Sequence, residues 1–209
     1  ASDPYDLYIA SHFYLAPELA YRERVHTLNL LAERFDTHLY TASVRPDTVN
    51  AFRHAEAFAK APAASSPRTH AREKEEGSPY RLALSPRLHV HPPVATLTEM
   101  PHIFRNAKIN LQITLRSIET GISQRVFDVL ACGGFLLCNY QEEIPELFTP
   151  ERDLVMYESP ADLAEKCAYS LSHEEERLAV AQSGQAKLRA VHTWSVRIAR
   201  MTELALRGE

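Results

Sequence analysis

The turn 116–123, directly before a predicted helix, contains an arginine, a glycine and several residues with hydroxyl groups. The free backbone amides at the start of that helix, at residues 122–124, can bind a phosphate, and the helix dipole adds about half a positive charge there. Arg116 and Arg125 can reach the same space and offer bidentate contacts to a diphosphate. Gly121 concentrates backbone freedom in this turn. These residue types therefore predict a diphosphate-binding turn.

Asp128 lies two turns into the predicted helix and shares a face with Gln124 and Arg125 through three- and four-residue spacing. A carboxylate at this position can accept two hydrogen bonds from the hydroxyls of a ribose. The alternative is a simple ion pair between Arg125 and Asp128 along the helix, and these residues alone leave both interpretations open. The chain has no G-x-G-x-x-G pattern and no P-loop lysine pattern that would strengthen the nucleotide interpretation.

The turn and its helix lie between two predicted strands. The apolar runs Ile109–Leu115 and Phe135–Cys138 have strand length, and the apolar residues between them recur at helical spacing until a glycine pair ends the helix. A strand, helix, strand order with short connections indicates a parallel sheet, in which ligands bind beyond the carboxyl ends of the strands. We therefore expect the turn 116–123 and the loop 139–143 to line one crevice.

The first forty residues have the same order of elements. Asp6–Ala10 and Thr37–Thr41 are predicted strands, and Ala20–Phe35 between them has apolar residues at helical spacing. Arg22 and Arg24 lie near the start of this helix, where its amides would face an anion. The alternative is that both arginines are solvated and pair with nearby glutamates, which contributes little free energy. We include Arg24 among the candidate ligand-binding residues.

Two histidines occupy a further short predicted strand. His89 and His91 lie on one face of it, and this spacing permits a metal pair. No third ligand is evident, so we interpret both as ordinary strand residues and expect no metal. Pro93 and Val94 follow in a stiff loop at the carboxyl end of the strand, where a flat base could rest against exposed backbone.

The segments on either side of this strand are predicted to be two helices and one long loop. Asp47–Ala61 is a helix, and Thr98–Arg105 is a short helix with Thr98 as its cap. Residues 61–86 are rich in proline, serine and charge and have no apolar period. They cannot bury enough surface to offset the entropy of ordering, so we expect a mobile loop or an insertion there.

The last quarter of the chain is predicted to complete the sheet and cover it. Leu154–Tyr157 is a strand, and Ser159 caps the helix that follows. Glu174–His192 and Thr193–Leu206 are two further amphipathic helices. We expect Trp194, at their junction, to lie in the core.

Composition bounds the class of protein. The 209 residues carry a net charge of −4 with a pI near 6.2, which gives no bulk attraction to nucleic acid or anionic lipid. No apolar run is long enough to cross a membrane. The three cysteines, Cys132, Cys138 and Cys167, lie in apolar surroundings and predict buried free thiols in a reducing cytoplasm. Because the chain begins at Ala1 directly before a strand, we expect a fragment or a processed chain.

Residues 99–148 and 153–177 resemble the C-terminal domain of CgeB-type (spore-maturation-like) glycosyltransferases of the GT-B fold, and residues 22–41 resemble it more loosely. The resemblance implies an α/β fold, a Rossmann-like parallel sheet with helices on both faces. Residues 1–209 would then form a single domain that binds a nucleotide sugar. An N-terminal domain, expected to be missing here, would contribute the acceptor site and usually the catalytic base.

The resemblance also assigns roles to residues. In related retaining enzymes two glutamates separated by seven residues contact the donor sugar and the ribose. Thr120 occupies the first of these places and Asp128 the second, so the sugar site loses a carboxylate while the ribose keeps its acceptor. By the same resemblance, the diphosphate would meet the amides of Gly121, Ile122 and Ser123, the base would meet Pro93 and Val94, and Gln141, Glu142 and Glu143 would face the cleft between the two domains.

Three functions follow as hypotheses. The first is the donor-binding half of a cytoplasmic glycosyltransferase that uses a UDP- or GDP-sugar, keeps no permanently bound cofactor, and stabilises the departing diphosphate through amides and arginines rather than a metal. Its acceptor would be a glycan, a protein or a small molecule, and no residue offers a convincing general base. The second is a non-catalytic binding or assembly module, which Thr120 favours. The third is a sugar-nucleotide epimerase of the same architecture.

Overall fold

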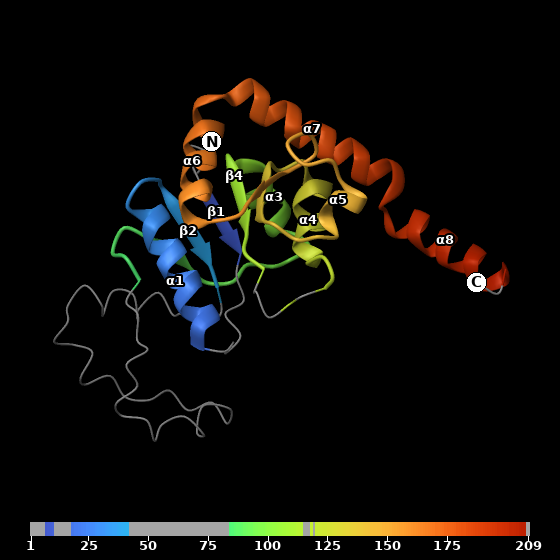
Figure 1. Ribbon diagram of the computed structural model, residues 1–209, viewed down its shortest axis with the longest axis horizontal. Helices are drawn as coiled ribbons and strands as arrows, with labels where there is room; N and C mark the ends of the chain where they lie inside the picture. Colours follow the sequence, from blue (N-terminus) through green and yellow to red (C-terminus); the bar gives the residue numbers. More distant parts are fainter. Residues whose placement is uncertain (1–6, 11–17, 42–83, 115–117, 119, 208–209) are drawn as a thin grey trace, which may run out of the picture.

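A six-stranded sheet forms the centre of the computed structural model, which describes residues 7–10, 18–41, 84–114, 118 and 120–207 (Figure 1). The strand order is β3-β2-β1-β4-β5-β6, and all the strand pairings are parallel. This is the doubly wound order in which ligands bind at the point where the strand sequence reverses, between β1 and β4. The strands are β1 (Leu7–Ala10), β2 (Thr37–Tyr40), β3 (His89–His91), β4 (Ile109–Gln112), β5 (Leu136–Asn139) and β6 (Val155–Tyr157).

Helices cover both faces of the sheet, as the family resemblance implies. The described helices are α1 (Glu18–Ala32), α3 (Met100–Asn106), α4 (Gln124–Cys132), α5 (Ile144–Leu147), α6 (Pro160–Ser172), α7 (Glu174–Val191) and α8 (Trp194–Arg207). In Figure 1, α1 and α6 lie on one side of the strands and α3 and α4 on the other. The predicted α/β fold with a parallel sheet is therefore confirmed.

Two apolar clusters hold these layers together. Leu137 packs with residues of α1 and α6, whereas Leu136 and Cys138 pack with residues of α3 and α4. Successive strand residues point to opposite faces, so a continuous apolar run supplies both clusters. Each fully buried leucine contributes about 1.5–3 kcal/mol relative to an exposed one. The buried strands therefore fix the carboxyl edge on which the candidate site is built.

Helix α4 ends at the glycine that the sequence predicts, but it begins at Gln124, about two residues after the predicted start. The Ser123 side chain caps it by accepting a hydrogen bond from the Arg125 amide, and Val126, Val129 and Leu130 are buried. Gly133 ends it with a left-handed φ of 77°. The helix therefore starts at the end of the predicted diphosphate turn, with its first amides directed toward that turn.

Three local predictions are wrong. The cap of α3 is Glu99 rather than Thr98, and the Glu99 carboxylate accepts a hydrogen bond from the Ala95 amide at 2.8 Å. Trp194 is 71% exposed rather than in the core, because α8 extends beyond the body of the sheet and none of its described residues is buried (Figure 1). Cys132 is only half-buried, whereas Cys138 and Cys167 are buried as predicted.

Other predictions fall outside the described residues. These are the helix Asp47–Ala61, nearly all of the segment 61–86, Arg116, and the side chain of Arg22. Among the described residues, no helix is both long enough and apolar enough to span a lipid bilayer.

Candidate functional site

The chain that follows β4 and the loop that follows β5 are joined by hydrogen bonds at the carboxyl edge of the sheet. The Thr114 amide donates to Asn139 Oδ1 at 2.6 Å, and the Thr114 hydroxyl donates to Gln141 Oε1 at 3.1 Å. The Gln141 side-chain amide donates in turn to the Gly121 carbonyl at 3.1 Å. Because Gln141 is only 8% exposed, this contact fixes the turn against the second loop. The two segments that the sequence places in one crevice therefore lie together.

Gly121 makes the turn possible. Its φ is 94°, a backbone conformation that side-chain-bearing residues rarely adopt. Its amide donates to Glu143 Oε1 at 2.7 Å, while Glu143 Oε2 is buried and accepts no hydrogen bond from any described residue. An anionic group of the chain itself therefore occupies the first of the three amides expected to meet a diphosphate.

The start of α4 carries the predicted ribose carboxylate. Gln124 Nε2 donates to Asp128 Oδ1 at 3.3 Å, so the two side chains share a face as their spacing predicts. Asp128 is half-buried and Gln124 exposed, which leaves the carboxylate within reach of solvent. Within the part of the chain that the structure describes, Asp128 forms no ion pair with Arg125, so the simple pairing alternative is not formed.

Arg125 packs toward α3. Its guanidinium carbon lies 5.4 Å from the centre of the Phe104 ring, a cation–π distance. Its Nη1 atom is buried and has no hydrogen-bond acceptor among the described residues. A buried cationic donor without an acceptor is costly, so this atom is a candidate partner for an incoming anion.

Arg24 reaches the site from α1. Its Nη2 atom donates to the Ile113 carbonyl, just beyond the end of β4, at 3.0 Å. Burial lowers the pKa of Arg24, and the neighbouring Tyr157 opposes that shift. A guanidinium keeps its charge under such a perturbation, so Arg24 brings a fixed positive charge to the switch point between β1 and β4.

The remaining candidates lie around these residues. Thr120 and Glu142 are exposed, Ile122 and Ser123 are half-buried at the turn, and Pro93 is exposed. Val94 is half-buried against the apolar cluster that contains Met100 and Phe104. Arg116 lies outside the described residues.

Sequence reasoning did not foresee that Glu143 would hold the Gly121 amide. Its place in the loop after β5 brought it near the site, but the contact depends on the conformation of two loops. Asp36 and His38 were also missed as neighbours of His89, because their meeting depends on the register of two strands.

A hollow between β6, α6 and α7 contains none of the predicted site residues. It is lined by residues such as Val155, Lys166, Tyr169 and Arg177. These residues lie beside the far strand of the sheet rather than at the turn after β4. The hollow is therefore separate from the candidate site, which is defined by the hydrogen bonds and charges at the turn after β4 and the loop after β5.

Comparison with known proteins gives one family. A family model described as glycosyl transferase-like matches residues 53–203. The comparison with curated protein sequences found no significant match.

Solved structures share the fold. Sucrose-phosphate synthase from Thermosynechococcus elongatus superposes with a TM-score of 0.63 at 12% identity over 99% of this chain and 46% of that one. HepE from Anabaena, in complex with UDP and glucose, gives 0.62 at 10% identity over 99% and 49%. The C-terminal domain of a group 1 glycosyl transferase, LpcC from Francisella tularensis, gives 0.55 at 12% identity over 90% and 86%.

The share of each solved structure that this chain matches corresponds to one domain of the fold. The chain spans about half the length of the first two of these structures and most of the isolated C-terminal domain. At these identities the likeness shows the fold alone. The expectation of a Rossmann-like half of a GT-B fold is thereby confirmed.

Proposed function

Because the chain belongs to the glycosyl transferase-like family, we propose that it binds a nucleotide-diphosphate sugar as donor for transfer of the sugar to an acceptor. The observation that carries the proposal is the turn at Gly121, whose positive φ and cap at Ser123 direct the first amides of α4 to the ligand edge of the sheet. HepE, which shares this fold, was solved with UDP and glucose. That complex supports a UDP-sugar as the first donor to test.

The roles of the site residues follow from their charges. The diphosphate would lie at the amides of residues 121–124, and the helix dipole favours its negative charge. Arg24 brings a positive charge to the switch point. The buried Nη1 atom of Arg125 has no hydrogen-bond acceptor among the described residues and can donate to the diphosphate. As the bond to the sugar breaks, charge grows on the departing phosphate oxygen, and these fixed donors stabilise it.

Asp128 would hold the ribose. Its carboxylate already accepts a hydrogen bond from a side-chain amide, so it has the lone pairs and the orientation to accept two ribose hydroxyls in place of that contact. Pro93 and Val94 would border the base. Gln141 and Glu142 would border the sugar at the loop after β5.

Calorimetric titration of UDP, GDP and their sugars tests the proposal. Asp128→Asn removes the charge with little change in volume and is expected to weaken UDP binding by about tenfold, the loss typical of one charge-assisted contact. Glu146→Gln, an exposed change of the same chemistry on α5, is the matched control. If neither the parent nor the control binds any of these nucleotides, the donor proposal fails.

We further propose that the chain is CgeB-like and works with a second domain. The support is the resemblance of residues 99–148 and the span of the chain, about half of the longer structures it matches. The second domain would provide the acceptor site and the catalytic base. The retaining or inverting outcome would be decided there and at Thr120.

A non-catalytic binding module is the second candidate. Thr120 carries no carboxylate, and Glu143 fills the Gly121 amide with a group of the chain itself. A decayed site would bind no nucleotide, and the domain would instead associate through its surface. Calorimetry without any nucleotide signal, together with a stable self-associated species in light scattering, would favour this function.

A further inference from the structure

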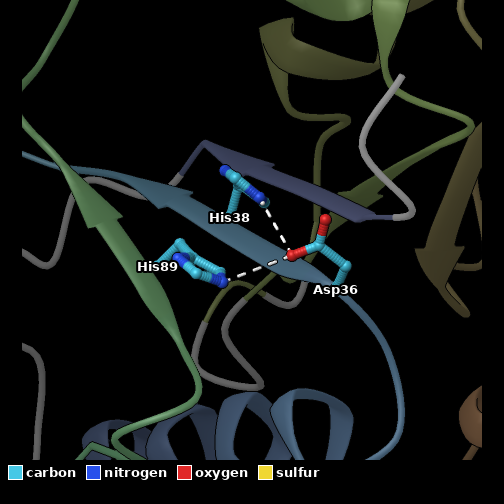
Figure 2. A group of neighbouring side chains, drawn as sticks. All are labelled: Asp36, His38 and His89. Atoms are coloured by element: carbon cyan, nitrogen blue, oxygen red, sulfur yellow. Dashed lines mark hydrogen bonds and ion pairs between the residues drawn. The ribbon is translucent and has the colours of Figure 1, made fainter. Parts of the chain in front are cut away.

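Three side chains, Asp36, His38 and His89, meet at the amino edge of β2 and β3 (Figure 2). His38 Nε2 lies 3.1 Å from Asp36 Oδ1, and His89 Nε2 lies 3.4 Å from the same oxygen atom. One ligand atom from each residue falls within 4.8 Å of the other two. Both imidazoles and the carboxylate therefore converge on one small volume.

The sheet register brings these residues together. His38 and His89 are direct partners in the parallel pairing of β2 with β3, so their side chains leave the sheet on the same face. Their rings stack with centroids 4.7 Å apart. Asp36 lies just before β2 and turns its carboxylate toward both rings (Figure 2). The cluster is thus built on paired strands rather than on separate loops.

Two of the three ligand-atom separations fit a tetrahedral metal. Zinc binds imidazole nitrogen and carboxylate oxygen at about 2.0–2.2 Å, which sets neighbouring ligand atoms about 3.3–3.5 Å apart in a tetrahedron. The two nitrogen–oxygen distances at Asp36 are close to this spacing. Two imidazoles favour a transition metal over Mg²⁺ or Ca²⁺, which prefer oxygen ligands.

A second layer of contacts orients His38. Its Nδ1 lies 2.8 Å from His91 Nε2, and His91 stacks on Tyr40 with centroids 4.5 Å apart. A histidine that binds a metal through Nε2 carries its proton on Nδ1 and donates it to a neighbour. In this arrangement His91 is the acceptor, and His38 is held with Nε2 toward Asp36.

We propose that Asp36, His38 and His89 bind a divalent transition metal, with Zn²⁺ as the first candidate. The Asp36 and His89 side chains are 50% and 54% exposed, so water can complete the coordination. The metal would join edge strand β3 to β2 and stabilise the folded chain. It lies at the amino ends of these strands, whereas the candidate donor site lies at the carboxyl ends of β4 and β5.

Zinc titration of the full chain, without an affinity tag and after dialysis against a chelator, tests the proposal. We expect saturable binding by calorimetry and a rise in the thermal midpoint with Zn²⁺ concentration. His89→Gln and Asp36→Asn should each weaken binding at least tenfold, as expected when a metal ligand is lost. His102→Gln, which changes an exposed histidine of α3, should bind as the parent does.

The three variants show whether zinc binds at the Asp36, His38 and His89 cluster or elsewhere on the chain. The changes at Asp36 and His89 lie at half-exposed side chains that contact the buried His38, so circular dichroism is used to check that the variants fold. Zinc binding that is equal in all four proteins, or absent from the parent, would overturn the proposal. UDP affinity should be the same in His89→Gln as in the parent, so the donor proposal and the metal proposal can fail independently.

Discussion

Glu143 holds the backbone amide that a phosphate would need. Its Oε1 accepts from Gly121 at 2.7 Å, and its other oxygen is buried without a donor among the described residues. Two anions cannot share one amide, and a carboxylate beside a diphosphate also repels it. Binding of a nucleotide at this turn therefore requires Glu143 to move or to lose its charge.

Replacing Glu143 tests this competition. We predict that Glu143→Gln tightens UDP binding by about three- to tenfold, since removal of a like charge at this range is worth about 1 kcal/mol. Calorimetry measures the affinity, and Glu146→Gln, at an exposed residue of α5 outside the candidate site, is the control. A loss of affinity in Glu143→Gln would instead show that the carboxylate contributes to binding.

The three thiols should differ in reactivity. Burial raises the pKa of Cys138 and of Cys167 to about 12, and burial also raises the pKa of the half-buried Cys132. A raised thiol pKa leaves less thiolate, which is the reactive form, at any pH below it. We predict that Ellman's reagent at pH 8 modifies Cys132 first in the folded chain, and all three thiols only after denaturation. Equal, rapid reaction of all three in the folded chain would contradict this.

At the scale of elements, α7 packs closely against the rest of the domain at Gly184. A Cβ atom there would lie 2.1 Å from the Asp153 carbonyl oxygen and 2.8 Å from a methyl of Leu130. Any side chain therefore forces α7 away from α4 and from the chain before β6. The close approach explains why a glycine is tolerated in the middle of this helix.

Two glycine variants compare the free-energy cost of overpacking at Gly184 with the cost of backbone strain at Gly121. We predict that Gly184→Ala lowers the free energy of unfolding by more than 2 kcal/mol, because overpacking displaces a helix. Gly121→Ala should cost about 1 kcal/mol, because its φ of 94° strains a side chain while no atom lies within 4 Å of the added Cβ. Urea unfolding followed by circular dichroism gives both values. An equal cost at the two positions would rule out the close approach of α7.

Much of this architecture could be predicted because its signals are local. The apolar stripe at Val126, Val129 and Leu130 and the glycine at 133 placed α4, and Ser159 was correctly predicted as a cap. What could not be predicted depends on distant residues. The contact of Glu143 with Gly121 needs two loops, and the contact of Asp36 with His89 needs the register of β2 and β3. Trp194 was misplaced because an apolar side chain at a helix start does not show whether another surface covers it.

At the scale of the whole molecule, the chain has the Rossmann-like fold of one half of a GT-B glycosyltransferase, and no catalytic base is identified among its described residues. It spans about half of the longer structures that share its fold. Catalysis by proton transfer needs a base within hydrogen-bond reach of the acceptor hydroxyl. We predict that this chain alone binds a donor sugar but transfers none of it to model acceptors. Product analysis with a labelled UDP-sugar checks this, and the appearance of a labelled glycoside would contradict the need for a second domain.

The central claim is that the turn at Gly121 binds a diphosphate, and its backbone amide can be observed directly. The chain has only 6 glycines, so ¹⁵N-glycine labelling gives a simple NMR spectrum in which Gly121→Ala identifies the Gly121 signal. On addition of UDP, we predict a saturable shift of the Gly121 amide and no shift of Gly184 in α7. UDP binding that shifts other glycine signals while the Gly121 signal stays in place would contradict the account.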